Sequence, residues 1–395
     1  MPTLTHELLD RMSRTGDPDG DAVIREHAAW NEQQPGATPS PRSLVEGLAR
    51  SLSFASDNSP AVLAYLDAKP EPPIPVDQDR IDRGVEFFAD HSLEIGSALF
   101  CGSLPAGYAS PRGARVLTLT GQLTHQLVRR VMETAQMVIN VTRPGGLETG
   151  VGPGYKDVRR VRLMHAAIRY FIEHDPAVPR TPHLPVPPDG WCTGWGTPIN
   201  QEDMLGGMLT FTVTVFEVLD KLDVKYRSED AEAYLHLWCV VASLLGVDPS
   251  LLPENRKVAE EMADFIRSRQ LDPSRDGRML TQALVESLQA MAPAKAVGGL
   301  VPAIIRWYLG PEVALLLGIE WSPWAYVFEG PVSWVSRVIH MDERRYGLTR
   351  LLIRQIGGSG IEGFMKKNRI GGREPFDLPN ELRERLDEGP TRFYT

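Results

Sequence analysis

The sequence predicts an all-α fold, made of a single large helical domain that follows an N-terminal extension. Apolar residues recur at helical spacing over long segments, and no alternating pattern long enough to form a substantial strand interrupts them. The chain has 395 residues, of which 42% are hydrophobic, so it can bury a large core. These observations together favour helices packed on helices.

Residues 1–76 are expected to form the N-terminal extension. Residues 1–35 carry only weak helical signals, and a helix is predicted at Ser43–Ser53. Lys69–Pro75 contains four prolines, which fix φ and remove backbone donors, so this segment should be an extended connector. We therefore place the boundary of the main helical domain, residues 77–395, after this connector.

The main domain is expected to consist of long helices separated by clear stop signals. Asn200 is a good N-cap, with Glu202 and Asp203 in the first turn where the helix dipole favours acids. Residues 175–197 are rich in proline and should form a long ordered loop, and the last 70 residues should mix short helices with loops. The predicted helices are Asp79–Ser97, Gln122–Val141, Asp157–His174, Asn200–Leu222, Glu229–Leu245, Arg256–Arg267, Asp276–Ala292 and Val301–Leu309.

Composition argues against several classes of protein. The net charge of −9 disfavours a nucleic-acid binder, which usually needs a basic surface. Cys101, Cys192 and Cys239 are far apart and have no zinc-site spacing, which favours a reducing, cytoplasmic location without zinc or disulfides. The N-terminus lacks the pattern of a signal peptide. We expect no membrane span either, because charges and prolines interrupt the most apolar stretch, Ala296–Phe328, which should instead form buried helices.

The segment around His165 is predicted to be a helix in the middle of the molecule. At 100° per residue, His165 falls on an apolar face. Met164 and Phe171 belong to a second apolar face, and a helix that is apolar on two sides is buried.

Five segments in this order resemble the catalytic domain shared by the rubber oxygenases (latex clearing proteins) and the ER-bound oxygenase mpaB. The resemblance implies an all-helical fold, and its rubber-cleaving members hold a b-type haem and add O₂ to carbon–carbon double bonds. The segments are Cys101–Pro105, Arg130–Gln136, Arg162–Arg169, Pro198–Leu205 and Tyr234–Trp238.

Two positions depart from the pattern of the rubber-cleaving members. Their haem-ligating histidine lies two turns into the helix after the Pro-Ile-x-Gln segment, where this chain has Leu209 followed by Thr210. Their Lys-Thr pair is replaced by Arg160 and Val161. An arginine keeps the positive charge but is a poor iron ligand because it stays protonated.

Two histidines and three arginines are the candidate active-site residues. His165, or else His236, could ligate haem iron as the axial metal ligand, although a core histidine is the favoured interpretation for each. Arg160 is the nominated basic residue near the iron. Arg162 and Arg169 could bind haem propionates or a substrate carboxylate, or could form buried ion pairs with Glu133 or Glu173.

The remaining candidates concern the walls of a pocket. Gln201 and Asp203 could contact a ligand, but a capping role for Asp203 is the favoured interpretation. The glycine-rich run 150–154 lacks a preceding strand and the dinucleotide spacing, so no nucleotide is expected. The expected lining residues of a substrate pocket are Met164, Phe171, Gly206, Leu209 and Thr210.

Two functions follow from the sequence. The first is a haem-dependent oxygenase acting on an apolar, unsaturated small molecule, with a homodimer as the expected assembly. The second is a scaffold of the same family without haem, which binds a hydrophobic ligand or catalyses a cofactor-free cyclisation or isomerisation. Leu209 favours the second function, and the resemblance favours the first.

Overall fold

The computed structural model describes residues 4–34, 40–54, 58–120, 126–291 and 299–323, and these residues are mostly helical. The one sheet in this part of the chain pairs β1 with β2 in parallel, Arg180 beside Trp191 and Thr181 beside Cys192. In chain order the elements are α1 (His6–Met12), α2 (Pro18–Glu32), α3 (Pro41–Phe54), α4 (Pro60–Asp67), α5 (Gln78–Asp90), α6 (Ser92–Ala98), the π-helix η1 (Leu99–Ser103), α7 (Leu104–Tyr108), α8 (Pro111–Leu119), α9 (Gln126–Val141), α10 (Pro153–His174), β1 (Arg180–Thr181), β2 (Trp191–Cys192), the 3-10 helix η2 (Thr193–Trp195), α11 (Gln201–Lys221), α12 (Ser228–Leu244), the 3-10 helix η3 (Pro249–Leu251), α13 (Arg256–Gln270), α14 (Arg275–Met291), α15 (Leu300–Leu309) and α16 (Pro311–Leu316).

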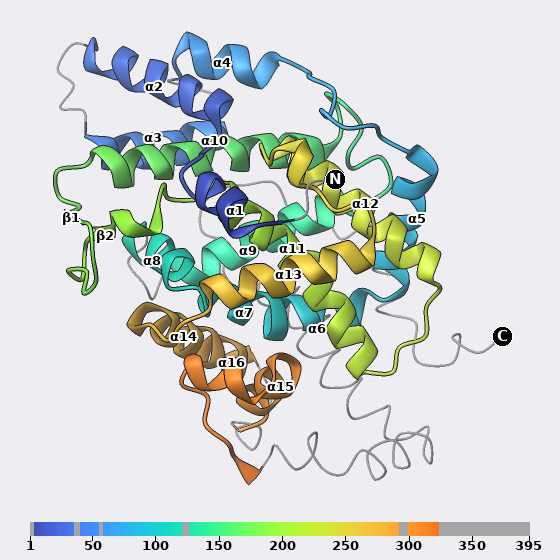
Figure 1. Cartoon of the computed structure of the whole chain (residues 1–395). Helices are drawn as coiled ribbons and strands as arrows, with labels where there is room; N and C mark the ends of the chain where they lie inside the picture. Colours follow the sequence, from blue (N-terminus) through green and yellow to red (C-terminus); the bar gives the residue numbers. More distant parts are fainter. Residues whose placement is uncertain (1–3, 35–39, 55–57, 121–125, 292–298, 324–395) are drawn as a thin grey trace.

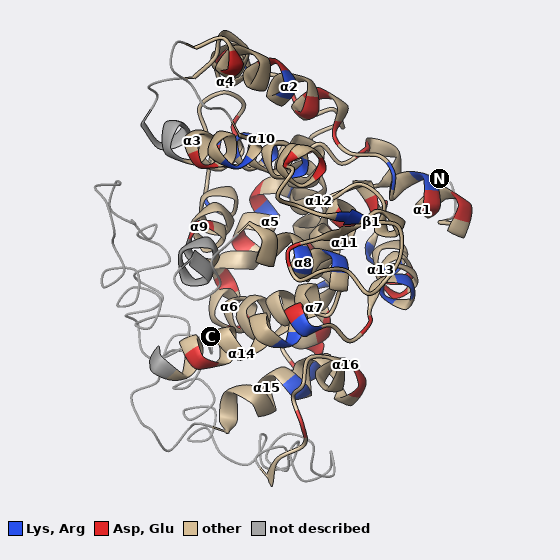
Figure 2. Cartoon of the chain, turned by 90° about the vertical axis from the view of Figure 1, so that its left-hand side faces the viewer, with Lys and Arg blue, Asp and Glu red and all other residues tan. Residues whose placement is uncertain are grey.

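The all-α prediction is confirmed, and α10 lies between two layers of helices. Figure 1 shows α2 and α4 of the N-terminal extension on one side of α10 and the main body of the molecule on the other, and α3 packs alongside α10 (Figure 2). The main core forms where α11 packs against η1, α12 and α13, and where α12 packs against α5. A smaller core lies between α10 and the N-terminal helices and includes Ile24, Leu48 and Leu163.

Most helix positions agree with the sequence patterns, with two differences. The predicted helix Asp79–Ser97 is two helices, because the backbone at His91 (φ −116°, ψ 25°) leaves the helical conformation between α5 and α6. The weak signals in residues 1–35 correspond to two helices, α1 and α2. Residues 122–125 of the predicted helix that became α9, and all of the last 70 residues, lie outside the described part of the chain.

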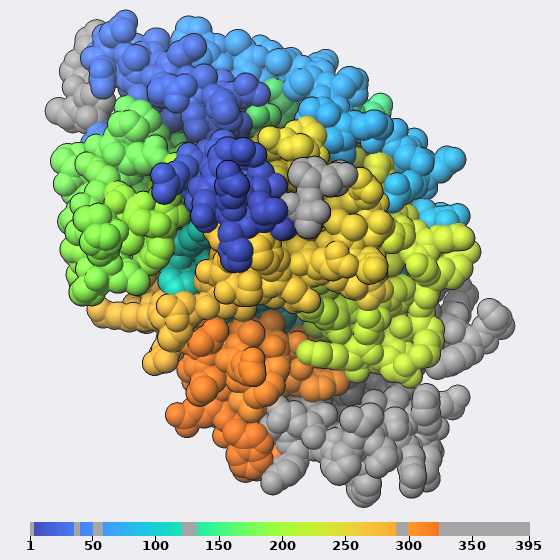
Figure 3. Space-filling model, in the orientation of Figure 1, coloured from blue at the N-terminus to red at the C-terminus, as the bar shows by residue number. Residues whose placement is uncertain are grey.

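The long loop before α11 is held in place by the N-terminal extension. Gly196 has φ +87°, and a Cβ there would lie 2.1 Å from the carbonyl oxygen of Ser13, so only glycine allows this approach. The backbone N–H of Thr197 donates to the same carbonyl over 3.0 Å. Figure 3 shows α1 lying across α13, where Arg269 forms an ion pair with Asp10 over 2.7 Å.

No helix in the described ranges combines the length and apolarity that crossing a bilayer requires. The stretch 299–323, part of the most apolar segment of the sequence, instead contributes α15 and α16. Leu300, Val301 and Ile305 of α15 are buried in the main core, which agrees with the prediction of buried helices.

Arg162 on α10 should matter far more for stability than Arg160 two residues earlier. Replacing Arg162 with alanine leaves the buried carboxylate of Asp17 without its 2.6 Å partner, which we expect to lower the free energy of unfolding by about 3 kcal/mol. Arg160 is half exposed and contacts Asp157 at 3.5 Å, so Arg160→Ala should cost less than about 1 kcal/mol. Urea unfolding of the two variants measures the difference, and equal losses would contradict this account of the N-terminal extension.

Candidate functional site

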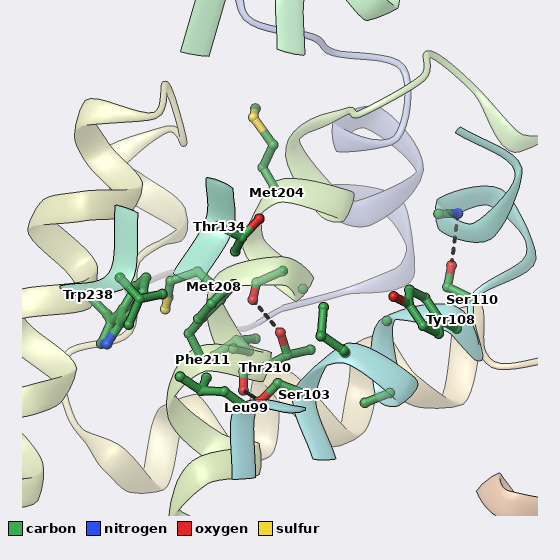
Figure 4. A pocket seen from close by; sticks show the side chains of 18 of the residues that line it. Leu99, Ser103, Tyr108, Ser110, Thr134, Met204, Met208, Thr210, Phe211 and Trp238 are labelled. Atoms are coloured by element: carbon green, nitrogen blue, oxygen red, sulfur yellow. Dashed lines mark hydrogen bonds between the residues drawn. The ribbon is translucent and has the colours of Figure 1, made fainter. Parts of the chain in front are cut away.

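A large cavity runs between α9, α10 and α11. Its volume is about 910 Å³, and most of the side chains around it are apolar. Figure 4 shows Met204, Met208 and Phe211 of α11 on one part of its wall, with Trp238 of α12 stacked on Phe211 at 4.6 Å between ring centroids. Further walls come from α6, η1, α8, α13 and α15.

The structure brings together four of the five nominated pocket residues. Met164 of α10 and Gly206, Leu209 and Thr210 of α11 all line the cavity. Phe171 does not line it, because it packs in a separate cluster beside the long loop and lies under the guanidinium of Arg42 at 5.5 Å. Leu209 is only 2% exposed, so the position that the resemblance assigns to a haem histidine is a buried aliphatic wall.

His165 lines the same cavity, whereas His236 has a structural contact elsewhere. His165 shares the cavity-facing side of α10 with Val161 and Ile168. The Nε2 atom of His236 accepts a hydrogen bond from the backbone N–H of Asp77 over 3.1 Å, which ties α12 to the start of α5. Burial lowers the pKa of His236, which agrees with a neutral imidazole that accepts this bond.

The three nominated arginines bind the protein itself. Arg162 donates to both carboxylate oxygens of Asp17 over 2.6 Å, and Arg169 pairs with Asp21, so both join α10 to the N-terminal extension. Arg169 also donates to the carbonyl of Ile199 over 2.7 Å. Arg160 is 48% exposed and is absent from the cavity wall. Asp17 and Asp21 are thus the acidic partners that the structure gives Arg162 and Arg169, in place of Glu133 and Glu173.

Ile199 is a strained residue that Arg169 holds at the edge of the cavity. Its φ of +51° is rare for a β-branched side chain and costs free energy of the order of 1–3 kcal/mol. The hydrogen bonds from Arg169 to the carbonyls of Pro198 and Ile199 fix this backbone. With this backbone conformation the chain turns from the long loop into α11. The side chain of Ile199 lines the cavity.

The N-terminal turn of α11 confirms the capping interpretation for Asp203. Asn200 accepts from the backbone N–H of Asp203 over 3.0 Å, and Asp203 accepts from that of Asn200 over 3.3 Å. The amide of Gln201 is also used internally, since it donates to the carbonyls of Gly16 and Gly246 and accepts from the N–H of Asp248.

Asp203 nevertheless also lines the cavity, and it belongs to a group of charges in which Arg112 and Arg269 face Glu202 and Asp203. Its carboxylate lies 2.6 Å from Arg112, which also contacts the fully buried Glu202 at 3.0 Å. Burial is the main cause that raises the pKa of Asp203 to about 6, and the charge of Glu202 adds to it, whereas Arg112 opposes it. A carboxyl that exchanges its proton near neutral pH therefore faces the cavity.

Several wall features had only faint signals in the sequence. The π-helix η1 places Ser103 so that its hydroxyl donates to the carbonyl of Thr210 over 2.5 Å, and π-helices occur often at functional sites. A Cβ at Gly207 would meet no atom within 4 Å, so this glycine opens onto empty space. Four methionines line the cavity, of which the two on α11 lie one turn apart; they are Met137, Met164, Met204 and Met208.

The chain is thus a helical protein whose central helices enclose a large, mostly apolar cavity, and such cavities are common sites for small molecules. The sequence model of one family, the catalytic domain of the ER-bound oxygenase mpaB/B' and rubber oxygenase, matches residues 91–337. The match covers more than half of the chain, so the chain belongs to this oxygenase family.

Two known proteins are similar to this chain. The rubber oxygenase of Streptomyces sp. (strain K30) is 26% identical over 249 residues, which cover 62% of this chain and 58% of that protein. The match therefore spans less than two thirds of the length of this relative. The solved structure of the latex clearing protein LCP in the closed state has a TM-score of 0.68 at 19% identity and covers 93% of this chain and 94% of that one, which shows a shared fold.

Among the described lining residues, His165 on α10 is the only histidine, and Leu209 provides no donor atom at the α11 position that the resemblance assigns to a histidine. The thioethers of Met204 and Met208 are the donors to iron that α11 offers instead. Gly207 leaves room for a flat group beside α11. No cluster of three or more His, Cys, Asp or Glu side chains suited to a metal ion exists within the described residues. The one iron ligand that the cavity wall offers as an imidazole is thus His165.

Asp203→Asn should change how stability depends on pH. Because the pKa of Asp203 in the folded protein, about 6, lies above its usual 3.8, its contribution to stability is complete below pH 3.8 and is lost as the pH rises through 6. Asparagine keeps the capping acceptor but does not titrate. We therefore expect the difference in melting temperature, variant minus unaltered protein, to increase as the pH is raised from 4 to 7. A difference that is constant over this range would refute the raised pKa.

Proposed function

We propose that this chain is an oxygenase-type oxidoreductase that encloses an apolar, unsaturated small molecule in the cavity between α9, α10 and α11. The observation that carries the proposal is the cavity of about 910 Å³ with mostly apolar walls, in a chain of the oxygenase family. Burial of the ligand's apolar surface would supply most of the binding free energy. The flexible thioethers of the four lining methionines let the wall adapt to the shape of the ligand.

A b-type haem is the proposed cofactor, and His165 is the residue that would bind its iron. A bound haem would supply the activation of O₂ that an oxygenase needs, and this chain supplies the imidazole and the apolar enclosure. Arg162 and Arg169 have no place in this proposal as direct contacts of cofactor or substrate, because their guanidinium groups bind Asp17 and Asp21. They act instead by fixing α10, on which His165 lies.

The second candidate is a haem-free member of the family that binds a hydrophobic ligand or rearranges it without a cofactor. Leu209 favours this function, because a buried leucine stands where the resemblance places the ligating histidine. Asp203 would be the available acid in such a reaction, since its carboxyl lines the cavity and its pKa of about 6 allows proton transfer near neutral pH.

The visible absorption spectrum distinguishes the two functions. We expect the protein, purified with added haemin, to show a Soret band that His165→Ala weakens strongly, because the mutation removes the only histidine among the described residues that line the cavity. His236→Ala is the control and should keep the band, since His236 is bonded to the start of α5. A preparation that stays colourless after haemin is added would overturn the haem proposal and support the haem-free function.

Filling the cavity should abolish ligand binding without loss of the fold. A leucine at position 207 starts from an open Cβ position, so Gly207→Leu should occupy the cavity and keep α11 intact. We expect it to lose most of the fluorescence enhancement of N-phenyl-1-naphthylamine, a neutral apolar dye. Gly47→Leu on α3 is the matched control, because a Cβ there also meets open space but Gly47 is not a lining residue. Equal dye binding by both variants would refute the assignment of the cavity.

A further inference from the structure

Thr134 on α9 presents a hydroxyl that no residue in the described part of the chain binds. The residue lines the cavity, and Figure 4 shows its oxygen on the same side as Met204, with Met208 and Thr210 below. Within the described part of the chain, this hydroxyl has no hydrogen-bond partner from the protein, whereas its helix neighbours Gln136 and Asn140 are bonded to each other over 3.1 Å. A polar atom is therefore available in an apolar wall.

Threonines in the other helices show what Thr134 does not do. A helical threonine commonly donates to the carbonyl one turn earlier. Thr142, which follows the last residue of α9, does so over 2.7 Å, and Thr212 and Thr281 do so over 3.3 Å and 2.8 Å. Thr210, on the opposite wall, donates to the carbonyl of Gly207 over 2.7 Å. Thr134 departs from this pattern at a position where its hydroxyl meets the cavity.

Two serine hydroxyls that also line the cavity are already bound to the protein. Ser103 donates to the carbonyl of Thr210, and Ser110 donates to the side-chain oxygen of Gln270 over 3.5 Å. The side chain of Thr134 is partly exposed, so water can bind its hydroxyl while the cavity is empty, and a ligand that carries an acceptor can replace that water. The hydroxyl of Thr134 is thus suited to select ligands by a hydrogen bond.

We propose that Thr134 is a specificity-determining residue, and that the preferred ligand is an apolar molecule carrying one hydrogen-bond-accepting oxygen, such as a ketone or an aldehyde. The hydroxyl of Thr134 donates to that oxygen, while the methionines and aliphatic side chains enclose the hydrocarbon part. This inference rests on the proposed function, because it requires that the cavity bind a small molecule. It adds a chemical preference that the apolar walls alone do not give.

The test compares two ligands of nearly the same shape, 2-nonanone and 2-methylnon-1-ene, in which a methylene group replaces the carbonyl oxygen. Each is titrated against bound N-phenyl-1-naphthylamine on the full-length protein and on Thr134→Val, which keeps the shape of the side chain and removes the hydroxyl. We expect the mutation to weaken the ketone about three- to tenfold, the effect of one hydrogen bond, and to leave the alkene unchanged. Thr210→Val is the matched control, because its hydroxyl already has a partner, and it should not change the ratio of the two affinities.

Each other outcome has a distinct meaning. If both ligands displace the dye and Thr134→Val weakens neither, or weakens both equally, the role of Thr134 is overturned and the cavity remains a binding site. If neither ligand displaces the dye from the unaltered protein, the proposed function fails, and this inference fails with it. Circular dichroism of the variant shows that a loss of ketone binding does not arise from unfolding.

Discussion

Burial of arginine side chains on α10 is the constraint on which the arrangement of this molecule depends. A guanidinium stays charged at any ordinary pH, so it can leave water only where oxygen atoms surround it. Arg159 meets that need with carbonyls of residues 65 and 68, Arg162 with Asp17, and Arg169 with Asp21 and the backbone before α11. All but the last of these partners belong to the N-terminal extension. Figure 2 shows how the extension and α10 bring basic and acidic residues together.

The same anchoring positions the cavity. With one side of α10 bound to the extension, its other side, with Val161, Met164 and His165, is fixed opposite α11. Two sets of hydrogen bonds fix the start of α11. Arg169 donates to the carbonyl of the strained Ile199, and the side chain of Gln201 donates to the carbonyls of Gly16 and Gly246. The chemical identity of the cavity then depends on which side chains α9 and α11 contribute. In this chain α11 contributes Leu209 where the family resemblance would place a ligating histidine. The imidazole that lines the cavity is that of His165, on α10.

The positions of the helices could be predicted from the sequence, but the side-chain partners across the fold could not. Periodic apolar residues and caps such as Asn200 are local signals, so α10 to α15 could be placed closely, and the family resemblance pointed to four of the residues that line the cavity. The roles of Arg162 and Arg169 could not be derived, because Asp17 and Asp21 lie about 145 residues away in sequence. A helical wheel shows that His165 and Phe171 are buried, but not that one faces a cavity and the other a solid core. Thr134 carried no signal at all, since the absence of a hydrogen bond can be seen only in three dimensions.

The four methionines of the cavity wall have a consequence for the durability of the protein. Thioethers are among the side chains that oxidants attack most readily, and a sulfoxide turns an apolar wall into a polar one. If oxygen is activated in this cavity, Met137, Met164, Met204 and Met208 would be oxidised to sulfoxides. Mass spectrometry would find the most oxidation at the methionine nearest to the reacting group. Under the proposed oxygenase function, oxidation of these methionines would limit the number of turnovers, and the oxidised positions would show where in the cavity oxygen is activated.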